Sequence, residues 1–148
     1  MSMCHPTIDE VLDDAMLRHP CLCVLLADDD AQMRALIAEP LRQDGYDVIE
    51  AANGIELIRA VHRFELAMAP LSAIITDVRM PGFSGLDVLE YMREAQWAVP
   101  VIVITAFGDD DTHERARTLD ARLVLDKPFD VEDLRVAVAC LTGPARPD

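Results

Sequence analysis

The sequence predicts an α/β domain in which five parallel strands form a doubly wound sheet. Short, continuous apolar runs, typical of strands buried on both faces, alternate with longer stretches that carry apolar residues at helical spacing. Strand and helix alternate five times within 148 residues, a length that suits one domain. Apolar residues make up 51% of the chain, which is ample for a packed core and excludes a disordered acidic tail.

Residues 1–20 precede the first strand and are predicted to form an N-terminal helical extension. Thr7 and Glu10 match a capping box, and apolar residues follow at helical spacing. Helices this short rarely persist alone in water, so we expect the extension to pack on a surface. Three alternatives stay open: docking on its own domain, contact with a partner or with a second copy in a homodimer, and fraying.

Four apolar runs and one alternating segment are predicted to form the strands. They are Leu22–Leu26, Tyr46–Ala51, Ala73–Ile75, Val101–Ile104 and Leu123–Leu125. The alternating segment, Tyr46–Ala51, is expected at an edge of the sheet.

Five crossover helices are predicted between and after these strands. Their apolar stripes lie within residues 33–41, 55–61, 86–92, 116–119 and 131–141. Pro40 falls inside the first of these helices, where it costs about 3 kcal/mol unless the helix kinks. The segment 109–120 is so polar that only Ala116 and Leu119 offer a core stripe.

The chain is strongly acidic. Its 13 Lys and Arg against 27 Asp and Glu give a formal charge of −14, which argues against direct binding of nucleic acid or anionic lipid. The N-terminus lacks the features of a secretory signal, and no apolar run approaches the roughly 18 residues of a membrane span. The four cysteines are scattered and include no CxxC pair. These features favour a cytoplasmic protein that does not enter a membrane.

Chemically active side chains gather where the predicted strands end. Asp28, Asp29 and Asp30 follow the first strand, Asp77 the third, Thr105 the fourth and Lys127 the fifth. In open α/β sheets, ligands bind beyond these carboxyl ends.

This set of groups describes phosphoryl transfer onto an aspartate. Clustered carboxylates repel one another unless a cation neutralises them, and hard oxygen ligands suit Mg²⁺. A carboxylate beside such an ion can attack phosphorus. Lys127 would then place a positive charge on the phosphoryl oxygens, and Thr105 could hydrogen-bond them.

Four motifs in this order and spacing resemble the receiver domains of two-component response regulators. They are VLLADDDAQMR (24–34), IITDVRMPGFSGLDVL (74–89), VIVITA (101–106) and DKPF (126–129). The resemblance runs from about residue 21 to residue 141. It implies a flavodoxin-like sheet with strand order 2-1-3-4-5, a receiver domain at 21–142 and a C-terminal tail at 143–148.

The resemblance also implies roles for individual residues. Asp77 looks like the phospho-acceptor, which would take its phosphoryl group from a histidine of a sensor kinase or phosphotransfer protein. Arg34 selects Asp28 and Asp29 as the acidic pair of the family's pattern. By this analogy Asp29 ligates Mg²⁺ directly, Asp28 acts largely through water, and the backbone carbonyl of Arg79 is a further ligand, with Mn²⁺ as a substitute ion.

The remaining motif residues follow the same analogy. Asp30 is expected to cap or begin the next helix, Thr105 resembles the switch hydroxyl, and Lys127 matches the family's lysine, often followed by a cis bond to Pro128. The family's partner face would correspond to about residues 109–141, and we expect it to bind a downstream protein.

Two positions depart from the family pattern. Val124 stands where the family usually has an aromatic switch residue, so the signal could travel through backbone movement instead. Asp120 stands where a glycine is common, although Asp tolerates a positive φ better than most residues.

Other functions fit the residues less well. A phosphatase of the haloacid dehalogenase type needs a second acid two residues after its nucleophile, and Arg79 stands there. A pseudo-receiver usually lacks one site residue, whereas this chain keeps them all. We therefore expect a switch that catalyses only its own phosphorylation and dephosphorylation. A stand-alone receiver is favoured, and a receiver excised from a longer transcriptional regulator is the alternative that the DVRMPG stretch keeps open.

Overall fold

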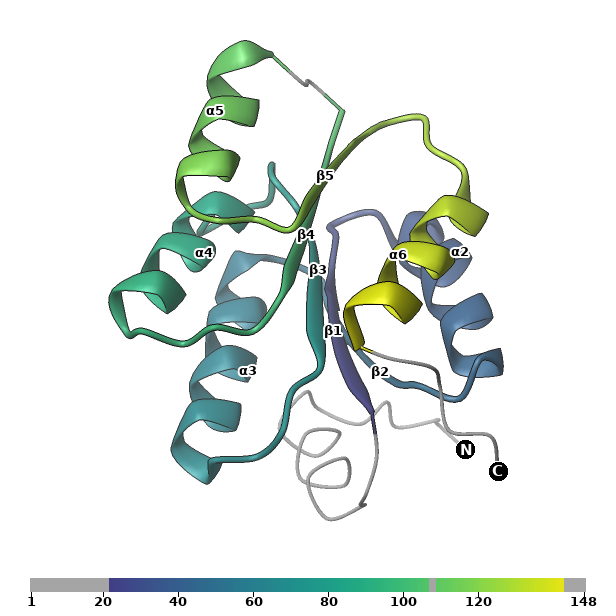
Figure 1. Ribbon diagram of the computed structural model, residues 1–148, viewed down its shortest axis with the longest axis horizontal. Helices are drawn as coiled ribbons and strands as arrows, with labels where there is room; N and C mark the ends of the chain where they lie inside the picture. The colour runs from purple at the N-terminus through teal and green to yellow at the C-terminus, as the bar shows by residue number, and fades with distance from the viewer. Residues whose placement is uncertain (1–21, 107–108, 143–148) are drawn as a thin grey trace, which may run out of the picture.

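A computed structural model describes residues 22–106 and 109–142 of the chain. Residues 1–21, 107–108 and 143–148 lie outside the described residues, and with them the predicted N-terminal extension and C-terminal tail. The described part forms one parallel sheet of five strands in the order β2-β1-β3-β4-β5 (Figure 1). The strands are β1 (Cys23–Ala27), β2 (Asp47–Ala51), β3 (Ala73–Asp77), β4 (Val101–Thr105) and β5 (Leu123–Asp126). The predicted fold class and strand order are confirmed.

The central strands are buried along their whole length, and all of their side chains except Thr76, Asp77 and Thr105 are apolar. This holds for β1, β3 and β4, whereas every residue of β5 and two of the five in β2 keep some exposure. The predicted edge position of β2 is correct, and β5 forms the other edge. The strands end one or two residues later than the apolar runs, because backbone pairing continues through Asp77↔Ile104 and Thr105↔Asp126.

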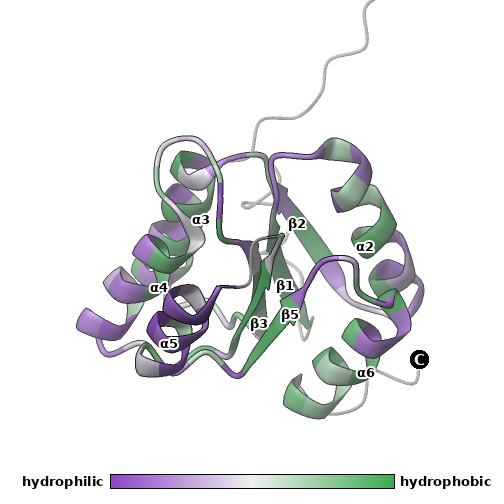
Figure 2. Ribbon diagram, turned by 90° about the horizontal axis from the view of Figure 1, so that it is seen from above, coloured by the Kyte–Doolittle hydropathy of each residue, from purple (hydrophilic) through white to green (hydrophobic). Residues whose placement is uncertain are grey.

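Helices cover both faces of the sheet (Figures 1 and 2). On one face lie α2 (Ala31–Gln43) and α6 (Val131–Thr142). On the other lie α3 (Gly54–Ala67), α4 (Gly85–Glu94) and α5 (Asp110–Thr118). None of the described helices is long and apolar enough to cross a membrane.

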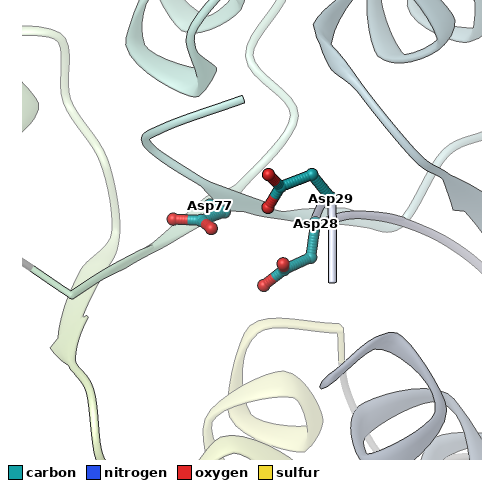
Figure 3. Close-up of side chains that lie close together, drawn as sticks. All are labelled: Asp28, Asp29 and Asp77. Carbon is teal, nitrogen blue, oxygen red and sulfur yellow. The ribbon is translucent and has the colours of Figure 1, made fainter. Parts of the chain in front are cut away.

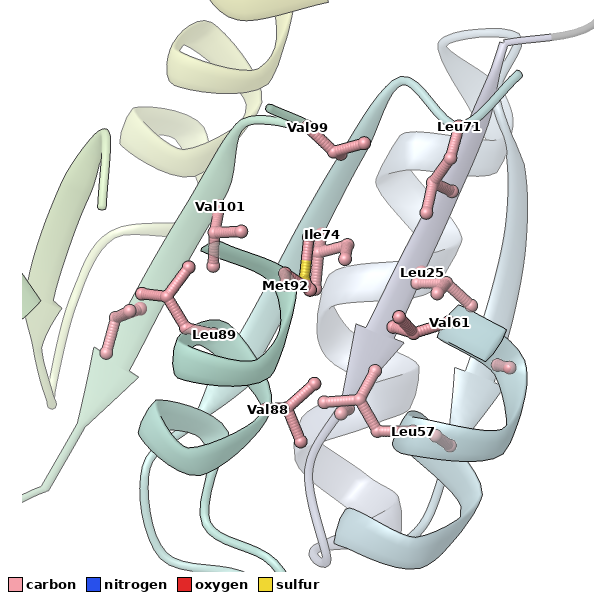
Figure 4. Packing of buried hydrophobic residues seen from close by; sticks show 14 of the residues in the cluster. Leu25, Leu57, Val61, Leu71, Ile74, Val88, Leu89, Met92, Val99 and Val101 are labelled. Carbon is pink, nitrogen blue, oxygen red and sulfur yellow. The ribbon is translucent and has the colours of Figure 1, made fainter. Parts of the chain in front are cut away.

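Two hydrophobic cores follow from this three-layer arrangement. The core beneath α3 and α4 includes Leu25, Leu57, Ile74, Leu89 and Met92, all almost fully buried (Figure 4). On the opposite face, apolar side chains of β1, β3 and β4 pack against those of α2 and α6. Helices therefore pack on both faces of the sheet, and this packing holds the carboxyl edge of the sheet in place.

Both helices that looked difficult in the sequence are present. Helix α2 continues through Pro40, which lies in its C-terminal part. Because proline has no amide hydrogen, the carbonyl of Leu36 loses its helical partner, but Leu36 is exposed and water can reach it. Helix α5 buries only Ala116, as its polar sequence predicts, and is almost uniformly hydrophilic (Figure 2). Asp109 immediately precedes it and caps it, because the Asp109 carboxylate accepts from the Thr112 amide at 2.8 Å.

Candidate functional site

The carboxyl ends of four strands bring the predicted site residues to one edge of the sheet. Asp28 and Asp29 follow β1, Asp77 ends β3, Thr105 ends β4, and Lys127 follows β5. The Lys127 amide donates to the carbonyl oxygen of Thr105 at 2.8 Å, so the lysine leaves the sheet beside the threonine. The structure thus brings all of these residues together.

An acidic cluster forms the centre of this edge. Asp28, Asp29 and Asp77 each place one carboxylate oxygen within 4.8 Å of the others (Figure 3). Asp28 and Asp77 are only 1% and 6% exposed, whereas Asp29 faces solvent. Among the described residues, this is the one group of metal-ligating side chains with such spacing.

Lys127 joins the two buried carboxylates. Its Nζ lies 3.2 Å from Oδ2 of Asp28 and 3.3 Å from Oδ2 of Asp77. Burial by itself disfavours the ammonium, but the two carboxylates outweigh burial and raise the pKa of Lys127. The pKa of Asp77 is raised because burial removes water from the carboxylate and Asp28 repels its charge, while Lys127 opposes both effects.

Hydrogen bonds fix the backbone that carries Asp28. Its Oδ1 accepts from the Asp30 amide at 2.9 Å, and Asp30 caps α2, as predicted, by accepting from the amides of Gln32 and Met33. The guanidinium of Arg34 donates to the carbonyl oxygen of Asp28 at 2.7 Å and to Glu50 Oε1 at 3.1 Å. The part played by Glu50 escaped the sequence analysis, because an acid in an edge strand carries no signal of its partner.

The loop after β3 is shaped around Asp77. The Arg79 amide approaches Asp77 Oδ1 at 3.4 Å. A side chain at Gly85 would collide with the Asp77 carbonyl oxygen and lie 2.7 Å from Oγ1 of Thr76. Gly82 adopts a φ of 89°, which favours glycine. Both glycines of the GFSG stretch are therefore required by the backbone.

Three further expectations concern residues near β5. The Lys127–Pro128 bond is cis, and Asp120 has a positive φ of 64°, both as predicted. Val124 is partly buried and packs against the core beneath α3 and α4. Its side chain is therefore part of the packing that supports this edge strand.

The donor set fits a small divalent cation. Three carboxylates against one ammonium leave two excess negative charges at the cluster. Every donor is a hard oxygen, and the exposed carboxylate of Asp29 opens the cluster to solvent. A shallow surface hollow beside it is lined by Asp29, Val78, Arg79, Met80, Pro81 and Ser84.

Residues 24–139 match the family described as the response regulator receiver domain. The chain belongs to this family. Receiver domains act as signalling switches rather than as enzymes that turn over an external substrate, and they bind Mg²⁺ at an acidic cluster of the kind seen here.

Curated relatives of this receiver domain include proteins of different lengths. It is 40% identical over 116 residues to the transcriptional regulatory protein PdtaR of Mycobacterium tuberculosis, covering 78% of this chain and 54% of PdtaR. It is 30% identical over 115 residues to sporulation initiation phosphotransferase F of Bacillus subtilis, covering 78% of this chain and 89% of that protein. The receiver domain thus spans about half of PdtaR and most of the Bacillus protein.

Solved structures of receiver domains have the same fold. The receiver domain of the Francisella response regulator 1452 superposes with a TM-score of 0.72 at 26% identity, over 82% of this chain and 96% of that one. The response regulator TrrA of Thermotoga maritima, in complex with Mg²⁺–BeF, gives a TM-score of 0.67 at 27% identity, over 81% and 98% of the two chains.

Proposed function

We propose that this receiver domain accepts a phosphoryl group on Asp77 from a phosphohistidine of a sensor histidine kinase or a phosphotransfer protein. The observation that carries the proposal is the contact of one ammonium, Lys127, with both Asp28 and Asp77 beside the open carboxylate of Asp29. An acceptor carboxylate, a cation for the phosphoryl oxygens and ligands for a metal then share one sheet edge.

Asp28, Asp29, Asp77 and the backbone carbonyl of Arg79 would hold the metal, for which we propose Mg²⁺ with Mn²⁺ as a substitute. The two oxygens of Asp28 already accept from Lys127 and from the Asp30 amide, which supports a role for Asp28 through water. Asp29 is exposed, which supports direct ligation. The ion would neutralise the negative charge that gathers on the phosphoryl oxygens during transfer.

In the transfer step, a carboxylate oxygen of Asp77 forms a bond to phosphorus as the bond from phosphorus to the imidazole nitrogen breaks. The electron pair of the broken bond stays on the imidazole of the donor. Lys127 already lies within 3.3 Å of the acceptor carboxylate, so it can follow the charge onto the phosphoryl oxygens without leaving the site. Thr105 ends the adjacent strand, where its hydroxyl could bond the new group.

We propose that phosphorylation then changes the surface formed by residues 109–141, which would bind a downstream protein. Helix α5 suits a moving element because it buries only Ala116. Polar contacts also hold it: His113 pairs with Asp126 of β5 at 2.9 Å, and Arg115 pairs with Asp87 and Glu90 of α4. The first of these pairs joins α5 to the residue beside Lys127.

The limits of this function follow from the same residues. We propose that the protein works in the cytoplasm, binds no nucleic acid itself and catalyses only its own phosphorylation and dephosphorylation. Arg79 in place of a second acid supports the last point. The division into an extension (1–20), a receiver domain (21–142) and a tail (143–148) is part of the proposal, as is an output through protein docking.

Intact-mass measurement after incubation with acetyl phosphate tests the proposal. The wild type should gain one phosphoryl group with Mg²⁺ and lose the gain with EDTA or in Asp77→Ala. Asp29→Asn should abolish the Mg²⁺-dependent gain, whereas the matched variant Asp30→Asn should keep it, because Asn also caps a helix. No gain in the wild type, or an undiminished gain in Asp77→Ala, would overturn the proposal.

A further inference from the structure

The outer surface of α3 exposes large apolar side chains and carries two arginines, although the chain as a whole is strongly acidic. Leu66 is 69% exposed and Met68, which ends the helix, is 89% exposed. Beside them a surface pocket of about 530 Å³ lies between α3 and α4. It is lined by Ile58, Arg59, His62, Arg63 and Tyr91. We call these five residues, with Leu66 and Met68, the α3 face.

We propose that residues 7–19 of this chain form an amphipathic helix that packs on the α3 face. The C-terminal end of α3 lies near the first residue of β1, at the opposite edge of the sheet from Asp77. This docking gives the N-terminal extension an intramolecular binding site.

The chain path brings the segment to this surface. The Ser72 amide donates to the Cys23 carbonyl at 2.9 Å, so the connection that follows α3 lies against the first residue of β1. Met68 is four residues from Ser72, a span of at most about 14 Å. In Figure 1 the end of α3 and the start of β1 both lie at the lower end of the molecule. The start of β1, to which residues 1–21 connect, therefore lies near the exposed end of α3.

Lengths and apolar spacing also agree. A helix over residues 7–19 would be about 20 Å long, close to the length of the 14-residue α3. Ile8, Val11, Leu12 and Ala15 fall on one side of such a helix. They would cover Leu66, Met68 and the pocket lined by Ile58 and Tyr91.

Charge complementarity favours residues 7–19, rather than a second copy of the chain, as the segment that packs on the α3 face. Residues 7–19 contain four acids, Asp9, Glu10, Asp13 and Asp14, against one arginine. Asp9 and Asp13 are spaced one helical turn apart, on the side of the helix next to Leu12 and Met16, and Arg59 and Arg63 are spaced one turn apart on α3. A second acidic copy of the receiver domain would match this basic pair less well than the N-terminal segment does.

Hydrogen–deuterium exchange of the full chain tests the docking. Amides of residues 7–19 should be protected at low micromolar concentration, and Leu66→Ser should lower their protection at least tenfold. The matched control is Leu36→Ser, since Leu36 is also exposed, at 60%, but lies on α2 across the sheet. Amides of β1 report global stability, so a variant that merely unfolds is recognised.

A charge exchange gives the second arm of the test. The double variant Arg59→Glu/Arg63→Glu should lose the protection of residues 7–19, and adding Asp9→Lys/Asp13→Lys should restore it. Arg117→Glu on α5 is the control for reversing one exposed charge. Unprotected residues 7–19 in the wild type, equal effects of Leu66→Ser and Leu36→Ser, or protection that rises with concentration together with a dimer mass would each overturn the proposal.

Discussion

Replacing Asp77 by asparagine should stabilise the metal-free protein at neutral pH. Asparagine keeps the size of the side chain and removes one negative charge. The charge is costly here because burial and Asp28 raise the pKa of Asp77 above its ordinary value of 3.8. Below pH 3.8 the carboxyl is protonated in both the folded and the unfolded chain, so the cost is absent; it develops as pH rises through the raised folded-state pKa.

The distances give the magnitude. With an effective dielectric constant near 20, Lys127 attracts Asp77 at 3.3 Å by about 5 kcal/mol. Asp28, no more than 4.8 Å away, repels it by at least about 3.5 kcal/mol, and exposed Asp29 adds roughly 1 kcal/mol at the dielectric constant of water. Attraction and repulsion nearly cancel, so the desolvation of the carboxylate, several kcal/mol for a buried ion, decides the sign.

Thermal unfolding in EDTA at pH 7.5 measures the effect. We expect Asp77→Asn to increase the free energy of unfolding by about 1–3 kcal/mol, which corresponds to a Tm rise of about 3–9 °C. Saturating Mg²⁺ should stabilise the wild type more than the variant and narrow this difference. Glu39→Gln, which removes one exposed charge from α2, is the control for net charge. A lower Tm for Asp77→Asn in EDTA would show that the attraction of Lys127 outweighs repulsion and desolvation.

Three further predictions concern the framework. Arg135 holds the pKa of Asp44 below its usual range, so Asp44→Asn should lower the Tm at pH 7. The difference in Tm between wild type and variant should vanish as pH falls through the folded-state pKa of Asp44. A difference in Tm that persists at low pH would contradict the pairing. Gly85→Ala should lower the free energy of unfolding by about 1–3 kcal/mol in chemical denaturation and should also reduce the rate of phosphorylation, because the alanine Cβ collides with the Asp77 carbonyl. An unchanged free energy of unfolding and an unchanged rate would show that the loop moves freely to accept the Cβ. Phe64→Ala should cost about 3–5 kcal/mol in the same assay, since Phe64 is buried in the core beneath α3; a loss below 1 kcal/mol would mean that the core collapses around the gap.

The sequence predicts the fold well because its signals are local. Continuous apolar runs mark β1, β3 and β4, and the polar segment 109–120 still forms a helix around Ala116. Strand ends were less well predicted, because pairing with neighbours extends β3 through Asp77 and β4 through Thr105. The N-terminal extension stays a prediction.

The candidate site is only partly visible in the sequence. Acids, a hydroxyl and a lysine at strand ends indicate which residues meet, because parallel strands share one carboxyl edge. The sequence does not show which of these side chains contact one another, because Lys127 bonds Asp28 and Asp77 across 99 and 50 residues of chain. Glu50 carries no sequence signal for its bond to Arg34, because that bond depends on the packing of α2 against β2.

The sequence by itself determined the alternation of strands and helices, the acidic charge and the set of groups that gather at one edge. Only the tertiary structure decided which carboxylates are buried, why Asp77 is hard to ionise, and that Arg59, Arg63 and Tyr91 frame a pocket at the face of α3. The physical reason is range. Hydrophobic periodicity acts over a few residues, whereas burial and electrostatic contact depend on side chains that meet only when the layers pack.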